Sequence, residues 1–337
     1  MDFALAPFLD IDTVFFRQSV LAVVIFLQVV LGMILPGQGH TPPHTVWFAQ
    51  KLYASLSHKL NRPGRSNGTL KVRGIIAVAF LVFVAWGLAR LSIITAYALP
   101  YGWLLSVFIV WGAVNVIVPW RVLRGMMNVQ SLDKVKASAK ALADLTDLKL
   151  SAQDNHTIAR SAVEYAGFSF LKFLVAPALF YLVFGVYGLM AYTFLAMPMH
   201  GISFGHRRHP AFYMLMDGIQ TLVDYIPARL AAFVLFLSAI LTPTARPASL
   251  MHVAFDGAQK WPGAIYGVIV KSMAGANNIS LGGGLKYRDG TKILYPWVGP
   301  KDATAKAGLD DIKRSFVLHV IGTIIIFLGL LISIVLL

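Results

Sequence analysis

The chain has 337 residues, of which 57% are hydrophobic and only 13% are charged, and its mean hydropathy is +0.69. A soluble globular protein usually carries about 25% charged residues, so this composition excludes an ordinary soluble domain and indicates a membrane protein. The absence of cysteine excludes disulfides, thiolate zinc sites and iron–sulfur clusters. The formal charge of +14 lies in loops beside apolar runs and not in a recognisable nucleic-acid-binding module, so we expect no nucleic-acid partner.

The chain begins with the acidic stretch MDFALAPFLDID, which has three aspartates and is followed by its first basic residue at Arg17. A secretory signal peptide starts with positive charge, so this stretch does not predict one. The positive charge further along the chain gives the orientation instead.

Long apolar runs predict an all-α polytopic integral membrane protein that forms a single domain over residues 1–337. About 20 apolar residues cross a bilayer as a helix, because every backbone polar group must be bonded within the segment. The run 167–197 fits either one tilted helix or a tight hairpin that bends at Gly185 and Gly188. The expected spans are about 19–36, 74–97, 102–119, 167–197 and 315–337, and the shorter run 228–242 fits a re-entrant segment.

Three polar segments, 38–73, 120–165 and 244–314, carry most of the positive charge. Loops rich in lysine and arginine stay in the cytoplasm, so we expect all three there, with the acidic N-terminus outside a bacterial inner membrane. An even number of crossings must then lie between residues 165 and 244. The segment 120–165 also predicts an amphipathic helix, because apolar residues recur at steps of three and four. These residues are Leu132, Val135, Ala139, Leu142 and Leu145.

The stretch HGISFGHRRHP contains three histidines, His200, His206 and His209. Two histidines three residues apart on a helix can share a metal ion. However, Arg207 and Arg208 lie between them, and their charge opposes a divalent cation. The stretch therefore favours a loop at the membrane surface or at an anion, and we assign no metal ligand in the chain.

The stretch LGGGLKYRDG, residues 281–290, combines three glycines with Lys286 and Arg288. Glycine amides and nearby cations can approach a phosphate closely. The Gly-Lys-Ser/Thr ending of a P-loop is missing, so a plain turn with basic neighbours remains the alternative.

Two acidic residues adjoin apolar runs. Glu164 lies one turn before such a run and either binds a cation or pairs with Arg160, four residues earlier; the helical spacing favours the ion pair. Asp224 opens the stretch DYIPARLAAF, where it suits an N-cap and Pro227 suits a first helical turn. Arg229 would then lie at the membrane interface, where it either extends toward water or holds an anionic ligand.

Four segments together resemble the CobD/CbiB family of cobalamin-biosynthesis membrane proteins, the adenosylcobinamide-phosphate synthases. They follow the family's order along the chain and cover most of residues 40–290. The segments are HTVWFAQKLYASLSHKLNRPGRS (44–66), AVEYAGFSFLKFLVAPALFY (162–181), DYIPARLAAF (224–233) and SMAGANNISLGG (272–283).

The resemblance implies ligation of aminopropanol phosphate to the carboxylate of adenosylcobyric acid, with ATP and Mg²⁺ as cofactors. Such chemistry needs acids to hold magnesium and cations or glycine amides to hold phosphates. On this basis Glu164 and Asp224 are the expected catalytic residues. The residues expected to bind substrate or phosphate are His44, Arg229, Gly282, Gly283 and Lys286.

The chain departs from the family pattern where that pattern has acidic and other polar residues. One family acid is replaced by Lys172, whose charge would repel magnesium. A second hypothesis is therefore a catalytically degenerate relative, without a cofactor, that acts as an accessory or structural subunit among other membrane proteins. The departing positions are Phe168, Ser169, Lys172, Phe173, Ala196, Met199, Gln220, Thr221, Trp261 and Gly263, and Pro262 is what remains of a Ser-Pro-Asn motif.

Overall fold

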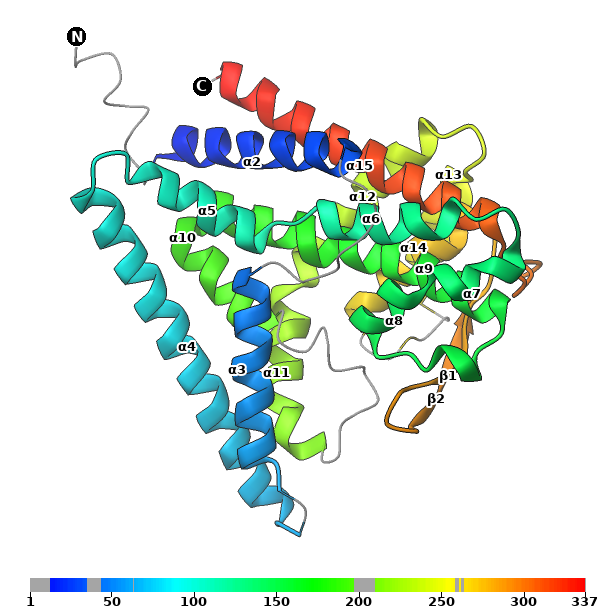
Figure 1. The fold of residues 1–337 in the computed structure, drawn as a ribbon, viewed down its shortest axis with the longest axis horizontal. Coiled ribbons are helices and arrows are strands. Elements are labelled where there is room, and N and C mark those ends of the chain that lie inside the picture. The colour runs from blue at the N-terminus through cyan, green and yellow to red at the C-terminus, as the bar shows by residue number, and fades with distance from the viewer. Residues whose placement is uncertain are drawn as a thin grey trace.

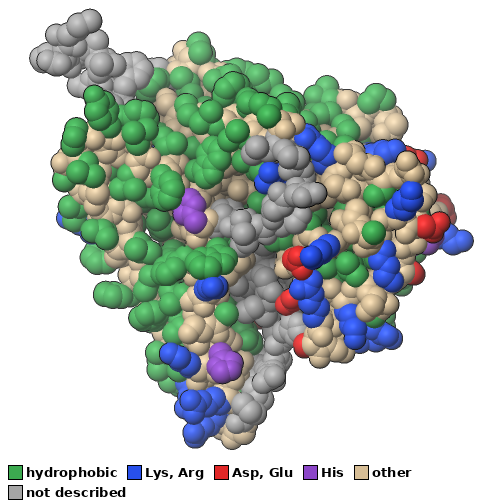
Figure 2. Space-filling view, viewed as in Figure 1, with side chains coloured by type: hydrophobic (Ala, Val, Ile, Leu, Met, Phe, Trp, Pro, Cys, Tyr) green, Lys and Arg blue, Asp and Glu red, His purple; other side chains and the backbone are tan. Residues whose placement is uncertain are grey.

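The computed structural model describes residues 13–34, 44–62, 64–196, 210–257, 261 and 264–336. Within these ranges the chain is mostly helical, with long apolar helices on one side and a smaller polar lobe on the other (Figure 1). Figure 2 shows hydrophobic side chains over the apolar side, whereas charged side chains gather on the lobe and at the tip where α3 meets α4. The frame comprises α2 (Val14–Ile34), α3 (His44–Leu60), α4 (Asn67–Ala98), α5 (Trp103–Ala113), α6 (Ile117–Met127), α9 (Asn155–Ser169), a π-helical segment (Phe170–Val175), α10 (Ala176–Ala196), α11 (Pro210–Val223), α12 (Tyr225–Ile240) and α15 (Leu309–Leu336).

The described residues contain five helices that are long and apolar enough to cross a membrane, and all five overlap the predicted spans. A further pair, α11 and α12, passes the same test only together and bends by 48° at Asp224. The predicted re-entrant run 228–242 is thus the second half of a longer bent pair. Three are continuous, Val14–Ile34, Asn67–Ala98 and Leu309–Leu336, and two pass on length and composition but contain breaks, Trp103–Met127 and Asn155–Ala196.

The helix pair α5 and α6 is interrupted at residues 114–116, and a side chain of α2 satisfies the backbone groups that the break exposes. Gln28 is fully buried; its Nε2 donates to the carbonyl of Val114 at 2.7 Å and its Oε1 accepts from the N–H of Val116 at 2.6 Å. Buried backbone polar groups need such partners, above all in a bilayer.

The run 167–197 folds as a hairpin. Gly185 has φ +62° and ψ −150°, a conformation that essentially only glycine adopts, and it interrupts α10. Nζ of Lys172 lies 3.0 Å from the carbonyl oxygen of Ala196, which brings the two ends of the run together. The hairpin alternative with its bend at Gly185 is therefore confirmed. Arg17 of α2 closes the bend by donating to the carbonyls of Leu182 and Val183.

The polar lobe joins the segment after α6 to the segment after α12. Leu148 forms a β-bridge with Tyr287, and Arg288 pairs with Asp144 at 2.5 Å. The two predicted loops 120–165 and 244–314 thus lie on the same side, as an even number of crossings between them requires. The lobe contains η1 (Leu132–Lys134), α7 (Val135–Ser138), α8 (Lys140–Thr146), η2 (Leu150–Ala152), α13 (Pro247–Ala254), α14 (Ala264–Asn277), β1 (Leu281–Lys286) and β2 (Lys292–Val298).

One expectation for the lobe needs correction. The amphipathic helix predicted around 132–145 is broken into η1, α7 and α8, although Val135, Ala139 and Leu142 are buried as the spacing indicated. The predicted all-α polytopic fold is confirmed, and it carries one small antiparallel hairpin, in which β1 and β2 pair with a register shift between Leu281 and Gly283.

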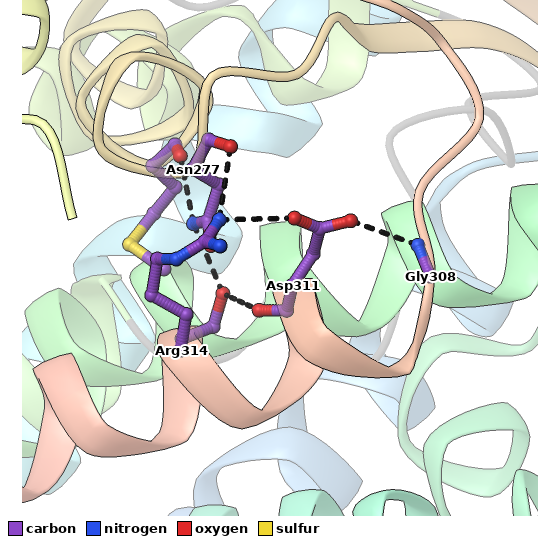
Figure 3. Close-up of polar contacts among 6 residues, drawn as sticks. Asn277, Gly308, Asp311 and Arg314 are labelled. Carbon is purple, nitrogen blue, oxygen red and sulfur yellow. Dashed lines mark hydrogen bonds and ion pairs between the residues drawn. The ribbon is translucent and has the colours of Figure 1, made fainter. Parts of the chain in front are cut away.

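The joint between the lobe and the last span is a polar network (Figure 3). Arg314 of α15 donates to the carbonyl oxygen of Asn277, the last residue of α14, at 3.0 Å, and to Oδ1 of Asp311 at 3.1 Å. The other oxygen of Asp311 accepts from the N–H of Gly308 at 2.8 Å. These bonds satisfy the ends of both helices where the chain passes from the lobe into α15.

Candidate functional site: an aromatic pocket above a buried ion pair

A cavity of about 120 Å³ lies between α9, α14 and the β-hairpin, where the frame meets the lobe. Its wall is mainly aromatic. The rings of Trp261 and Tyr295 stack with their centroids 5.2 Å apart and 17° between their planes. Burial and the neighbouring Tyr295 raise the pKa of Tyr287, which therefore stays protonated. The six aromatic residues of the wall are Tyr165, Phe168, Trp261, Tyr266, Tyr287 and Tyr295.

Glu164, the only glutamate of the chain, lines this cavity. Its Oε1 accepts from the backbone N–H of Gly282 at 3.1 Å, and Oε2 has no protein partner among the described residues. The ion pair with Arg160 predicted from the spacing is not formed directly. Arg160 donates instead to the carbonyl of Ala305 and to Oγ1 of Thr157. Glu164 therefore keeps one oxygen for a ligand.

Tyr165 adds a second polar group to the cavity wall. Its side chain is 4% exposed, and its hydroxyl is buried without a hydrogen-bond partner among the described residues. A buried hydroxyl without a partner is costly, so such a group in a cavity wall indicates a bound molecule or water. Glu164 and Tyr165 are thus two polar residues in a lining that is otherwise rich in aromatic rings.

The glycine-rich stretch forms strand β1 and not a phosphate-binding turn. Gly282 has φ +114°, and a Cβ there would lie 2.3 Å from the carbonyl oxygen of Pro296 in β2. Gly283 has φ +88°, and a Cβ there would lie 2.8 Å from the Trp297 ring. The glycines thus allow close pairing of the strands and bring one amide to Glu164. The turn of the hairpin follows them, between the paired residues Lys286 and Lys292.

Next to the cavity, on the other side of Tyr266, Lys172 and Asp224 form a fully buried ion pair. Nζ of Lys172 lies 2.5 Å from Oδ2 of Asp224, and the two side chains are 1% and 0% exposed. Tyr192 donates to Oδ1 of the same carboxylate at 3.0 Å. The expectation that Asp224 caps α12 through its side chain is therefore wrong, because both its oxygens point to other helices and make no cap bond.

Tyr266 connects the ion pair with the cavity. Its ring lines the cavity, and its hydroxyl lies 3.0 Å from Oδ2 of Asp224 and 3.2 Å from Oε1 of Gln220. Phe168 packs against it, with the ring centroids 5.5 Å apart. A ligand in the cavity would thus contact a side chain that also holds the buried carboxylate.

Five positions at which the sequence departs from the resembled family pattern meet at this site, although they are spread over nearly a hundred residues of sequence. Phe168 and Trp261 line the cavity, and Lys172 carries the buried charge. The carbonyl of Ala196 accepts from Lys172, and Gln220 contacts Tyr266. About half of the departures are therefore changes to one site. Met199, Pro262, Gly263 and the three histidines His200, His206 and His209 lie outside the described residues.

The other predicted ligand-binding residues are not among those lining the cavity. Arg229 donates to the carbonyl of Tyr225, one turn earlier in α12, and its guanidinium lies 3.6 Å from the Tyr225 ring centroid. His44 begins α3 and stacks on Phe108 of α5. Lys286 is exposed at the end of β1, opposite Lys292. Of the seven predicted site residues, the structure joins Glu164 and Gly282 directly.

Sequence reasoning did not single out Tyr165, Tyr266, Tyr287 and Tyr295. Tyr165 follows the only glutamate of the chain, and that adjacency is the one local signal that could have found it. The other three come from segments more than 100 residues away in sequence, so only the packing of α14 and the hairpin against α9 places them here.

Comparison with known proteins identifies related chains. The family model described as CobD/Cbib protein matches residues 22–319. A cobalamin biosynthesis protein CobD from Klebsiella pneumoniae is 26% identical over 291 residues, which cover 81% of this chain and 85% of that protein. CbiB from Salmonella arizonae is 24% identical, covering 85% and 89% of the two chains, and CobD from Clostridium perfringens is 22% identical, covering 92% and 97%. No solved structure matches significantly.

Proposed function

Because the chain belongs to the CobD/CbiB family of cobalamin-biosynthesis membrane proteins, we propose that its aromatic pocket binds the amine substrate of the amide-forming step of that pathway. The family resemblance gives this amine as aminopropanol phosphate and its corrinoid partner as adenosylcobyric acid. The observation that carries the proposal is the oxygen of Glu164 that has no partner among the described residues, on a side chain that lines a cavity with six aromatic residues.

The chemistry of the wall suits an amine. A carboxylate pairs with an ammonium group, and the faces of Trp261, Tyr266 and the other rings attract a cation. The Gly282 amide fixes one oxygen of Glu164, and the other has no partner among the described residues and is left for a ligand. A carboxylate in this position can also accept a proton from the bound ammonium and leave a nucleophilic amine.

The magnesium ion that the resemblance implies does not fit Asp224. Its two oxygens already accept hydrogen bonds from an ammonium and two phenols. A magnesium ion needs oxygen ligands that offer lone pairs, whereas these groups present hydrogen atoms to the carboxylate. Across the described residues, no group of three or more His, Asp or Glu side chains could hold a metal ion. We therefore assign the chain's own residues to amine binding and assign no step to Mg²⁺-ATP.

The accessory subunit is the second candidate function. It is favoured by one specific observation, the occupation of the buried carboxylate by Lys172. In this case the pocket would hold the amine or a related cation for a partner protein that forms the amide bond.

We further propose that the polar lobe faces the cytoplasm of a bacterial cell and that the N-terminus lies outside. The charge of the lobe segments and of residues 38–73 supports this orientation. The pocket would then open toward the compartment that holds the water-soluble substrates, while membrane lipid surrounds the frame.

Binding is tested by titrating purified protein with aminopropanol phosphate and following tryptophan fluorescence, since Trp261 lies in the wall. We expect the fluorescence to change saturably with ligand concentration. Glu164→Gln should lower the affinity for the ligand at least tenfold. Asp144→Asn, which removes an exposed lobe carboxylate outside the pocket, should leave binding unchanged. Absence of saturable binding in the folded wild type would reject the amine pocket.

Complementation separates the two candidates. If this chain forms the amide bond, a strain that lacks the synthase should grow when it expresses the chain, and Glu164→Gln should abolish that growth. Amine binding without rescue, at normal membrane levels, assigns the accessory function.

A further inference from the structure

The groups around Asp224 are arranged as they would be around a bound cation, and the ammonium of Lys172 occupies the position of that cation. Besides Asp224, the Lys172 ammonium donates to the carbonyl of Ala196 at 3.0 Å. The rings of Tyr266 and Tyr192 face it, with their centroids 5.0 and 5.5 Å from Nζ. A carboxylate, a carbonyl and two aromatic rings are all partners that a positive charge prefers.

The same cluster joins elements that are distant in sequence. Lys172 comes from the π-helical segment, Tyr192 and Ala196 from the second leg of the hairpin, Asp224 from the bend between α11 and α12, and Tyr266 from α14. Resident divalent ions commonly tie loops and helix ends together in this way, with carboxylates and carbonyls as ligands. Here one ammonium makes the corresponding contacts.

We propose that Lys172 is the resident cation of this site and that the chain keeps the site closed and charge-balanced without a divalent metal. The ammonium of Lys172 supplies in place the positive charge that the carboxylate and the carbonyl would otherwise take from a metal ion. The inference is independent of the amine pocket, because it concerns the Asp224 carboxylate and not Glu164.

The proposal predicts opposite metal responses for two variants. Mn²⁺ binding is measured on detergent-purified protein by electron paramagnetic resonance, together with the thermal midpoint in Mn²⁺ and in EDTA. Wild type should bind no Mn²⁺ at Asp224, so Asp224→Asn should leave any residual binding unchanged. Lys172→Asp should gain one bound ion and a midpoint that rises with Mn²⁺, and adding Asp224→Asn to it should remove both.

Two outcomes would overturn the proposal. Saturable Mn²⁺ binding by wild type that a cooperatively folded Asp224→Asn variant loses would overturn the proposal, because the metal would then share the site with Lys172. A folded Lys172→Asp variant that gains no ion would also overturn it. If Lys172→Asp does not fold, the comparison of wild type with Asp224→Asn still decides.

Discussion

The ring of Phe180 stacks on the ring of Tyr192, with centroids 5.1 Å apart and 22° between the ring planes. Twelve residues of continuous α-helix would separate them by about 18 Å along the axis. The contact exists because the chain reverses at Gly185, and the second leg then reaches Lys172. The bend therefore builds the buried half of the site.

Gly185→Ala should consequently destabilise the protein by about 1–3 kcal/mol, because a side chain strains this φ and ψ combination. Gly87→Ala is the matched control, since Gly87 lies inside α4 with open space where its Cβ would be. Alanine there should be neutral or stabilise by up to about 1 kcal/mol. Thermal unfolding in detergent measures both. Equal midpoints for the two variants would contradict the assigned bend.

The Lys172–Asp224 pair should show strong coupling. Lys172→Met or Asp224→Asn alone leaves a buried polar or charged group without its partner and should cost about 3–5 kcal/mol, as for other buried pairs. The double variant should cost clearly less than the sum of the two. A double-mutant cycle of unfolding free energies checks this, and simple additivity would show that the pair does not interact as described.

Gly282→Ala should damage the pocket. The new Cβ would lie 2.3 Å from the Pro296 carbonyl oxygen, so β1 must shift and its amide must leave Glu164. Gly284→Ala is the control, because its nearest neighbour, the Lys292 side chain, would lie 3.7 Å away. We expect Gly282→Ala to lower both the thermal midpoint and the affinity for the amine, and Gly284→Ala to change neither appreciably.

The stability of α9 should depend on pH through the protonation of Asp154. Its Oδ1 caps the helix by accepting from the N–H of Thr157 at 2.5 Å. Partial burial alone would raise the pKa of Asp154, but the hydrogen bonds from Thr157 and the charge of Arg160 lower it on balance. A lowered folded-state pKa stabilises the fold above the unfolded value, about 3.9, and this contribution is lost as the pH falls through the folded pKa.

Asp154→Ala should therefore cost about 1 kcal/mol at neutral pH, the usual cost of removing such a cap. Asp154→Asn keeps a capping oxygen and should lose less. The difference between wild type and Asp154→Asn should begin to shrink below the unfolded pKa, about 3.9, and continue to shrink as the pH falls through the lowered folded-state pKa of Asp154. Thermal midpoints between pH 3 and 7 test this; a difference that grows in acid would mean the sign is wrong.

The orientation can be tested directly because the chain has no cysteine of its own. Lys301→Cys places an exposed thiol on the lobe, and Tyr101→Cys places one at the turn between α4 and α5, where Tyr101 is 76% exposed. In spheroplasts, a membrane-impermeant maleimide should label Tyr101→Cys at once and Lys301→Cys only after permeabilisation. The reverse pattern would invert the proposed topology.

The spans could be predicted from sequence because hydropathy acts locally and the bilayer fixes the length of a helix. Gly185 could be anticipated as a bend for the same local reason. The break at residues 114–116 could not, because its backbone groups are satisfied by the distant side chain of Gln28. Local spacing also misassigned Glu164 to Arg160, whereas the partner of Glu164 comes from a strand 118 residues later.

The site itself was only partly predictable. Family resemblance marked Glu164, Asp224 and the glycines, and it marked Lys172 as an anomaly. It gave no reason to connect the anomaly with Tyr266, which lies 94 residues further along the chain (172 to 266) and forms the floor between cavity and ion pair. The phosphate-binding role of Arg229 stays a prediction. In the described part of the chain, the Arg229 side chain contacts the carbonyl and the ring of Tyr225.

Helix α2 carries side chains that complete segments lying later in the chain. Arg17 completes the reversal at Gly185, and Gln28 completes the gap after Val114. Until those segments are synthesised, α2 holds a guanidinium and an amide that lipid cannot satisfy. We therefore expect α2 to stay close to the segments around Gly185 and Val114 as they enter the membrane, so that insertion and folding of this protein overlap in time.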